Sequence, residues 1–469
     1  MKNLVKLFGL LAAMSMVVAL IGCGPAATPT AVAPTAVPAT AVPVAPVPTP
    51  GPVTLRYANW NLGTEADNNI ERQMIKTYTY SHPWVTIQIV DMSGDGGWDG
   101  ILTGLAAKGQ LPDVFMANNV PLYVQNGWLA DLGAVSSADP DWPFIAQPLK
   151  DAFTYSGKLM ALPAGQFIMG YWVNTDLYDK ANLDAPAYGM SVDDFFTTAK
   201  ALNNPAKGIL GLDEQFAIEG WYPHTQDAKL MYYGFDGTHM NYNSAAFKDA
   251  VAKTTEMIPY TWQGLTDADK KNFKSVGPWE LFTNQEVGVR WDASWNLPGW
   301  VKDAKFNWDF VGIPGGSQAI VFDAMVVSKT SVNVAAAYDF ARWMTFGSEG
   351  YQERAGLSKP LGLGLNLPVA MTPDNIALFK TFVDKPGINK ALDNLNGSLL
   401  ESLAKVVPGY IQARWEGKPG IDIADQKDVS IGWMLDNAPA GLFKFEDYSA
   451  KLETFANNIM DQAAAAVKK

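Results

Sequence analysis

An alternation of predicted strands and helices opens the folded part of the chain and restricts its fold more than any other feature of the sequence. Apolar and polar residues alternate as in a strand in each of three segments, and a helical pattern separates each pair of them. The strands are expected over 53–60, 84–92 and 111–118, and the helices over 70–82 and 97–110. Strand–helix–strand units of this kind predict an α/β fold with a parallel sheet.

Parallel sheets bind ligands at the carboxyl ends of their strands. In this chain those ends are expected at 59–61, 93–98 and 117–119. The chain has 469 residues, which is more than one hydrophobic core usually serves, so we expect two domains.

The amino terminus has the pattern of an export signal. Lys2 and Lys6 precede the apolar run "LFGLLAAMSMVVALIG", which is followed by Cys23, the single cysteine of the chain. The run is short for a bilayer-crossing helix, and its order of charge and apolar residues is that of a signal peptide. The stretch "LIGC" resembles a bacterial lipobox, which implies cleavage before Cys23 and a lipid anchor on its thiol. A buried free cysteine in an uncleaved anchor is the alternative.

Residues 24–52 are almost entirely Pro, Ala, Thr and Val, and they predict an extended linker between residues 1–23 and the folded body. The whole chain carries a net charge of −12. Such a charge argues against nucleic acid as a partner. The lone cysteine leaves no disulfide to support the exported body.

Most motifs of catalytic sites are missing from the sequence. The three histidines have no metal-ligand spacing, and neither a nucleophile elbow nor a phosphate-binding P-loop occurs. Asp292 and Asp323 are candidates for the paired carboxylates of a glycoside hydrolase, or they accept hydrogen bonds from hydroxyl or amide groups. We therefore expect no enzyme activity, no cofactor and no metal.

Aromatic residues gather where loops are expected, close to carboxylate and amide side chains. A sugar ring has apolar faces, which flat aromatic rings cover, and a rim of hydroxyls, which Asp and Asn can bind. "RWDASWNLPGW" at 290–300 has this chemistry. The aromatic residues in question are Trp60, Trp98, Trp128, Trp172, Trp221, Tyr222, Trp279, Trp291 and Trp295.

From Val53 to about Pro368 the chain resembles the carbohydrate-binding proteins of bacterial ABC importers, the maltose-binding-protein-like extracellular solute-binding family 1. The stretches that carry this resemblance are, in order, "LTGLAAKGQLPDVFMAN", "YSGKLMALPAGQFIMGYWVNTDLYDKANLDAP", "FTNQEVGVRWDASWNLPG", "VVSKTSVNVAAAYDFARWMTF" and "SKPLGLGLNLP". Relatives often have a small "GSW" turn where this chain has "ASW".

The resemblance implies a type II periplasmic-binding-protein-like fold, in which two α/β lobes close over a ligand cleft. Lobe one is expected at 53–163 plus 309–355 and lobe two at 168–305 plus 360–469. The hinge crossings are expected at "ALPAGQF" and "VGIPGG". The family's stacking position falls on Trp295, and its cleft loop supplies Trp221 or Tyr222. The expected ligand-binding residues are Trp60, Asn61, Asp95, Trp98, Asn118, Trp221, Tyr222, Trp291, Asp292, Trp295 and Asp323.

These features together predict a monomeric, lipid-anchored binding protein on the outer face of the cytoplasmic membrane. It would capture a sugar or oligosaccharide and deliver it to the permease subunits of an ABC transporter. Two other classes remain open: an exported glycoside hydrolase, and a carbohydrate-binding lipoprotein for adhesion or sensing.

Overall fold

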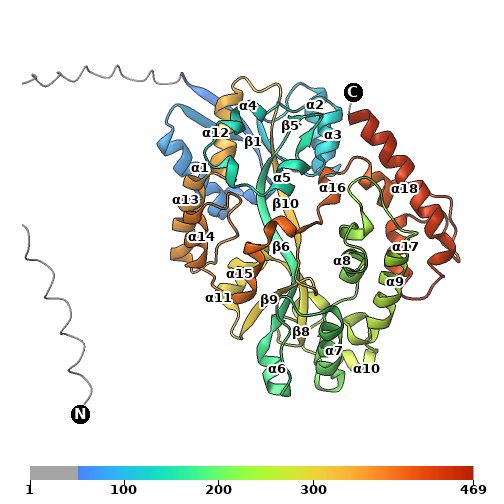
Figure 1. Cartoon of the computed structure of the whole chain (residues 1–469). Helices are drawn as coiled ribbons and strands as arrows, with labels where there is room; N and C mark the ends of the chain where they lie inside the picture. Colours follow the sequence, from blue (N-terminus) through green and yellow to red (C-terminus); the bar gives the residue numbers. More distant parts are fainter. Residues whose placement is uncertain (1–50, 468–469) are drawn as a thin grey trace, which may run out of the picture. The chain divides into compact units, whose positions relative to one another are not determined.

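A mixed sheet of nine strands organises residues 51–467, the part of the chain that the computed structural model describes (Figure 1). The predicted signal peptide, Cys23 and all but the last two residues of the predicted linker lie outside the described residues. The strands are β1 Val53–Ala58, β2 Val85–Ile89, β3 Val114–Ala117, β6 Leu162–Asn174, β7 Leu210–Leu212, β8 Val287–Ala293, β9 Trp308–Gly312, β10 Ala319–Val327 and β11 Leu399–Leu400, with β4 Thr154–Tyr155 and β5 Lys158–Leu159 in a separate hairpin.

The main path of the sheet runs β2-β1-β3-β10-β6-β8-β7, with β11 beside β10 and β9 beside β6. Strand β1 pairs in parallel with both β2 and β3. The predicted parallel start of the fold is therefore confirmed, and the carboxyl ends of β1 and β3 meet at one edge. Strand β10 then runs antiparallel to β3 and β6, and β6 runs antiparallel to β8, so the sheet as a whole is mixed.

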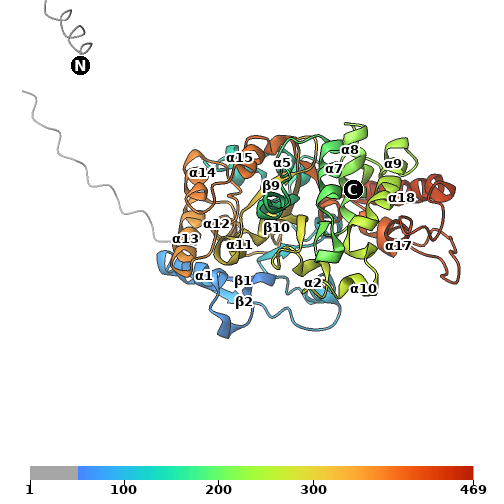
Figure 2. The same cartoon turned by 90° about the horizontal axis from the view of Figure 1, so that it is seen from below.

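Helices cover the sheet on both sides. Figure 2 shows α13 and α14 at the opposite side of the molecule from α9, α17 and α18. The helices are α1 Ile70–Ser81, α2 Gly97–Ala107, α3 Val120–Gln125, α4 Gly133–Ser137, α5 Gln147–Ala152, α6 Thr175–Ala181, α7 Val192–Leu202, α8 Phe216–Gln226, α9 Ala245–Met257, α10 Asp267–Lys270, α11 Leu297–Asp303, α12 Val334–Met344, α13 Ser348–Ser358, α14 Pro373–Lys380, α15 Pro386–Asp393, α16 Leu403–Val406, α17 Ile431–Asn437 and α18 Glu446–Val467.

Strands β6 and β10 run through the middle of the molecule (Figure 1). Leu162, at the start of β6, packs in a core cluster with β1, β3, α1 and α12, whereas Tyr171 and Trp172 near its end pack in two clusters with β8, α7 and α11. Strand β10 does the same in reverse, because Ala319 belongs to one of the latter clusters and Phe322 to the first. The two strands therefore connect separate hydrophobic cores.

Two glycines allow the chain to cross at this point. A Cβ atom on Gly170 of β6 would lie 2.7 Å from the Cα atom of Gly312 in β9. Gly312 itself has a φ of +74°, and a Cβ atom there would lie 2.4 Å from the carbonyl oxygen of Ser317. A side chain at either position would collide with backbone, so this close contact between β6 and β9 requires glycine at both.

All but the first residue of strand β9 falls within the boundaries expected for lobe one, but the strand packs in the core of the other expected lobe. Phe310 and Val311 of β9 lie in the clusters of β8, α7 and α11, not in the cluster of β1 and β3. The sequence pattern does not reveal this, because β9 is a continuous apolar strand that would suit either core. A further cluster joins α9, α17 and α18 through Phe247, Met434 and Leu452.

Candidate ligand-binding site

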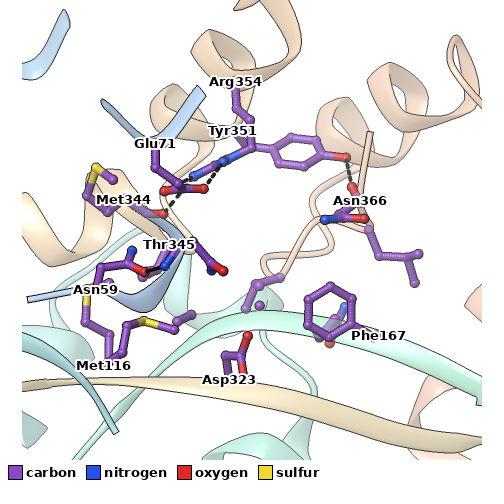
Figure 3. Close-up of a pocket in the computed structure, with 17 residues that line it drawn as sticks. Asn59, Glu71, Met116, Phe167, Asp323, Met344, Thr345, Tyr351, Arg354 and Asn366 are labelled. Carbon is purple, nitrogen blue, oxygen red and sulfur yellow. Dashed lines mark hydrogen bonds and ion pairs between the residues drawn. The ribbon is translucent and has the colours of Figure 1, made fainter. Parts of the chain in front are cut away.

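A cavity lies where β6 and β10 run side by side, next to the carboxyl ends of β1 and β3 (Figure 3). Its volume is about 100 Å³, whereas sites for drug-sized ligands measure about 300–1,000 Å³. The lining is half polar in character and includes two of the predicted residues, Asn61 and Asp323. The others are Asn59, Glu71, Met116, Ala164, Gly165, Gln166, Phe167, Met325, Met344, Thr345, Tyr351, Arg354, Asn366, Leu367 and Val369.

Asn59 and Asn61 reach the cavity because they follow β1 directly. The Asn59 side-chain oxygen accepts a hydrogen bond of 2.7 Å from the backbone N–H of Asn61, and this bond caps the short helical turn that begins at Trp60. The Asn59 amide nitrogen donates to the hydroxyl of Tyr57, also at 2.7 Å. Burial raises the pKa of Tyr57, so this hydroxyl stays neutral.

Asp323 points from β10 toward the hollow (Figure 3). The register of β10 against β6 shifts between Asp323 and Ala324. A bulge of this kind redirects a side chain that regular pairing would place elsewhere. The Asp323 Oδ1 atom lies 2.6 Å from Nζ of Lys405, a residue of α16 that also donates to the carbonyl of Phe322. A charged carboxylate is thereby held at the floor of the cavity.

Glu71 of α1 and Arg354 of α13 form the opposite wall of the cavity (Figure 3). The two guanidinium Nη atoms lie 2.5 and 3.2 Å from the two carboxylate oxygens, which is a bidentate ion pair. Burial opposes the positive charge of Arg354, but the attraction of Glu71 raises its pKa overall. The pair therefore keeps Arg354 charged and fixed in orientation.

Two amide side chains beside the cavity have spare hydrogen-bonding capacity. Gln166 donates from Nε2 to the carbonyl of Pro368 at 2.7 Å, but its buried Oε1 has no partner among residues 51–467. The side-chain Oδ1 of Asn366 likewise has no partner among these residues, although the backbone carbonyl of Asn366 accepts a hydrogen bond from the hydroxyl of Tyr351. Because buried oxygens are normally hydrogen-bonded, both are suited to accept from a ligand.

One aromatic ring of β6 lines the cavity and contacts a second ring outside the lining. Phe167 lines it and meets the ring of Trp295 edge to face, with centroids 5.8 Å apart. Trp295 lies in the turn after β8 and remains 43% exposed. Trp295 does not line the cavity itself, and an exposed indole next to a lining residue has a free face for a ligand.

The neighbours of Trp295 have a different role from the one expected. Trp291 is buried against Tyr171 in the core. Asp292 is 5% exposed, and its Oδ2 atom already accepts from Arg290 Nε at 2.6 Å and from Asn296 Nδ2 at 2.7 Å. The structure does not bring either to the cavity, because alternation along β8 turns both into packed surroundings. The expected platform of Trp291 and Trp295 is thus divided.

The expectation of ligand contact does not fit Trp221. This residue is fully buried and donates from its indole N–H to the hydroxyl of Tyr171 at 3.3 Å. Tyr222 is half-buried beside it, against Phe196. Both belong to α8, so the segment expected to be a cleft loop is a helix whose buried face carries Trp221.

The other predicted residues lie in the segments that follow β1, β2 and β3, outside the lining. Trp60 packs edge to face against Trp98, whose indole N–H donates to the carbonyl of Met116, a residue that lines the cavity. Asp95 and Asn118 are exposed in the turns that follow β2 and β3. These four residues surround the strand ends as predicted, although the structure gives none of them direct access to the cavity.

Several lining residues escaped the sequence analysis. Glu71, Tyr351 and Arg354 lie on helices with no unusual pattern, and only their packing brings them to the strand ends. Phe167 and Gln166 did have a signal, since both belong to the predicted hinge segment "ALPAGQF". A residue within a crossing between two cores is well placed to line the space between them.

A second hollow of about 690 Å³ lies between α5, α16 and the end of α18. Its lining contains none of the residues predicted to bind ligand, and many side chains in it are apolar, among them Tyr155, Phe235, Leu400, Val406 and Met460. No group of three or more His, Cys, Asp or Glu residues within residues 51–467 is arranged to hold a metal ion. Among the helices of these residues, none is long and apolar enough to cross a membrane.

Comparison with known families gives a match over most of the folded body. The sequence model of a family described as bacterial extracellular solute-binding protein matches residues 73–368. No curated protein sequence matches the chain significantly.

Three solved structures illustrate the fold to which this chain is similar. A sugar transporter protein from Rhizobium etli in an open conformation has a TM-score of 0.64 and 21% identity, covering 86% of this chain and 98% of its own. A solute-binding protein from Thermotoga lettingae bound with α-D-tagatose has a TM-score of 0.64 and 16% identity, and the match covers 88% of this chain and 100% of its own. An ABC substrate-binding protein from Listeria monocytogenes in complex with cycloalternan has a TM-score of 0.59 and 19% identity, and the match covers 88% of this chain and 98% of its own. At these identities the likeness establishes the two-lobed α/β fold.

Proposed function

This chain belongs to the bacterial extracellular solute-binding proteins, and from that premise we propose that it captures a sugar or oligosaccharide in the cavity between β6, β10 and the ends of β1 and β3. The captured ligand is handed to the permease subunits of an ABC transporter. The proposal extends the family membership to a ligand class and to a specific site.

The observation that carries the proposal is the chemistry of the cavity. Amide and carboxylate oxygens of Asn59, Gln166, Asp323 and Asn366 border it, and hydroxyl groups are the natural donors to such acceptors. The ring of Phe167 lines the cavity and meets the exposed indole of Trp295. Flat apolar faces beside a set of acceptors match the two surfaces of a sugar ring. Two of the three solved neighbours hold a carbohydrate, cycloalternan in one and α-D-tagatose in the other, which is in keeping with this ligand class.

We also propose that the cores joined by β6 and β10 act as two lobes. The first contains β1, β3, α1 and α12, and the second contains β8, α7 and α11. Two strands that cross between separate cores suit a hinge. A cavity of about 100 Å³ is small for an oligosaccharide, so entry of the ligand requires the lobes to separate and release requires the same.

The anchor and the location follow from the amino terminus and from the family. An extracellular family supports export, and Cys23 after "LIG" supports lipidation on the outer face of the cytoplasmic membrane. The linker over 24–52 then holds a monomeric folded body away from the lipid surface while it remains tethered beside its permease.

Hydrolysis is the less favoured function. Glu71 is bound by Arg354 and Asp323 by Lys405. A carboxylate held by a cation is suited to binding a hydroxyl, whereas a glycoside hydrolase needs one carboxyl that delivers a proton to the leaving group.

Isothermal titration calorimetry against a panel of neutral oligosaccharides tests the proposal, with chromatography of the sugars afterwards. We expect saturable binding of at least one oligosaccharide and its recovery unchanged. Recovery of shortened sugars would replace binding by hydrolysis, and the absence of binding by folded protein would contradict the ligand class.

A further inference from the structure

The charges around the cavity do not sum to zero when only its lining is counted. Within residues 51–467 the lining contains two carboxylates, Glu71 and Asp323, and one guanidinium, Arg354. Their sum is −1. A partly buried site with one unbalanced negative charge would favour a cationic ligand, such as an amino sugar.

Lys405 removes that imbalance from outside the lining. Its ammonium group lies 2.6 Å from Oδ1 of Asp323, with both side chains about one-fifth exposed. A second hydrogen bond of 2.9 Å to the carbonyl of Phe322 holds the ammonium in place. The four charges, Glu71, Asp323, Arg354 and Lys405, therefore sum to zero and form two ion pairs. Glu401 also attracts Lys405, but burial raises the pKa of the Glu401 carboxyl and so favours its neutral form.

A charged ligand would disturb this arrangement. Its own charge would enter a partly buried space without a free counter-charge, or it would compete for one partner of an existing pair and leave the other partner alone. Either outcome is costly because a desolvated charge needs a partner. A neutral hydroxyl, by contrast, can donate to a remaining lone pair of Asp323 or Glu71 while both ion pairs stay intact.

We infer that the ligand is an electrically neutral carbohydrate, and that Lys405 determines this selectivity by balancing the charge of Asp323. The inference rests on the proposed function, since it names the class of sugar that the same cavity accepts. Lys405 is a positioning residue here: it acts on the ligand through Asp323.

Matched sugar trimers that differ mainly in charge test the inference. The probes are the N-acetylglucosamine trimer against the glucosamine trimer, and methyl-esterified trigalacturonate against free trigalacturonate, together with maltotriose and xylotriose. Calorimetry is done at mildly acidic pH, where the ammonium and carboxylate groups of the probes carry their charges. We expect the best neutral probe to bind at least about tenfold more tightly than the best charged probe.

Two single variants should shift the selectivity in opposite directions. Lys405→Met leaves the site with a charge of −1, so affinity for the glucosamine trimer should rise relative to the N-acetylated trimer by about tenfold. Asp323→Asn leaves a charge of +1 and should favour free trigalacturonate over its ester. The double variant Lys405→Met/Asp323→Asn restores a sum of zero and should restore the preference for neutral sugars.

Lys427→Met is the matched control, because it removes the lysine of an exposed ion pair with Asp422 elsewhere on the chain. It should leave the selectivity unchanged. Thermal unfolding of every variant establishes that the compared proteins are folded, and the other single variant provides the test if one of the two is not.

The outcomes separate the inference from the proposed function. Tighter binding of a charged trimer than of any neutral one would overturn the inference and leave sugar capture standing. Neutral selectivity that survives unchanged in both single variants would overturn the role of Lys405. If folded wild-type protein binds none of the sugars, the proposed function itself fails.

Discussion

Phe167 and Trp295 meet edge to face at the border of the cavity, with ring centroids 5.8 Å apart. One belongs to β6 and the other to the turn after β8, so the contact joins a crossing strand to the core beyond it. Phe167 lines the cavity and Trp295 keeps much of its surface free. The pair is the aromatic face on which we expect a sugar ring to stack.

Trp295→Ala should therefore weaken ligand binding while leaving the fold stable. Removing an aromatic anchor typically costs about 2–4 kcal/mol of binding free energy, which corresponds to an affinity roughly 30- to 700-fold lower. Trp221→Ala is the contrasting variant, since this fully buried indole should lower the melting temperature instead. Calorimetry and thermal unfolding on both variants decide the matter. A Trp295 variant with lower stability and unchanged affinity would show that this indole is part of the core.

Gly170→Ala should destabilise the crossing of β6 and β9. The new methyl group would lie 2.7 Å from backbone atoms of Gly312, and forcing backbone apart in a packed region typically costs about 1–3 kcal/mol. Gly104→Ala is the control, because Gly104 is exposed in α2 with no atom within 4 Å of the added methyl. Alanine favours a helix, so this variant should be as stable as wild type or more so. Denaturant unfolding should show a lower free energy of unfolding for Gly170→Ala and an equal or higher one for Gly104→Ala. An equal change in both variants would contradict the requirement for glycine where β6 meets β9.

The free energy of unfolding should fall as pH rises through the range in which the buried carboxyl of Glu219 is protonated in the folded state but not in the unfolded state. Burial raises the pKa of Glu219 from its ordinary value of 4.5 to about 8, with Asp436 acting in the same direction and Arg414 against it. Below about pH 4.5 the group is protonated in both states and makes no difference. Between the two values the folded state alone retains the proton, so the free energy of unfolding decreases with pH until about pH 8.

Glu219→Gln removes the titrating group and should flatten this part of the curve. Denaturant unfolding at several pH values measures the slope, with the exposed Glu65→Gln as the control that should run parallel to wild type. If the slopes of wild type and Glu219→Gln coincide, the carboxyl of Glu219 does not titrate in this range.

Ligand binding should bring the two proposed lobes together. The cores on either side of β6 and β10 are separate, and the cavity between them is small, so admission of an oligosaccharide requires opening followed by closure. Small-angle X-ray scattering should give a smaller radius of gyration with saturating sugar than without it. An unchanged radius would count against a clamp that closes on its ligand.

Cys23→Ser should release the protein from membranes. The lipobox interpretation attaches lipid to the thiol of Cys23, and serine cannot accept it. Fractionation of cells that express the variant, with a salt wash to remove electrostatic attachment, measures the difference. Retention of the variant in the washed membrane fraction would contradict lipid anchoring.

The order of strands and helices at the start of the fold was predictable from sequence, because it depends on local pattern. Alternating residues identified β1, β2 and β3, and the helical patterns between them required parallel pairing. Parallel strands bring their carboxyl ends to one edge, and this placed Asn61 near the site before any contact was known. The expectation for Trp295 came instead from the spacing of Trp291, Asp292 and Trp295 and from the family resemblance.

Tertiary structure alone decided which side chains meet. Trp221 and Trp295 were both expected to contact the ligand, yet Trp221 is fully buried in α8 and Trp295 is 43% exposed in the turn after β8. Glu71 and Arg354 are 283 positions apart and form one wall, while Lys405 reaches Asp323 across 82 positions. Local periodicity specifies an element and its apolar face, but contacts between distant elements depend on how all the helices and strands pack together. That is why the sequence pointed to the strand ends, with Asn61 and Asp323, but not to the other residues of the cavity or to the pairing of its charges.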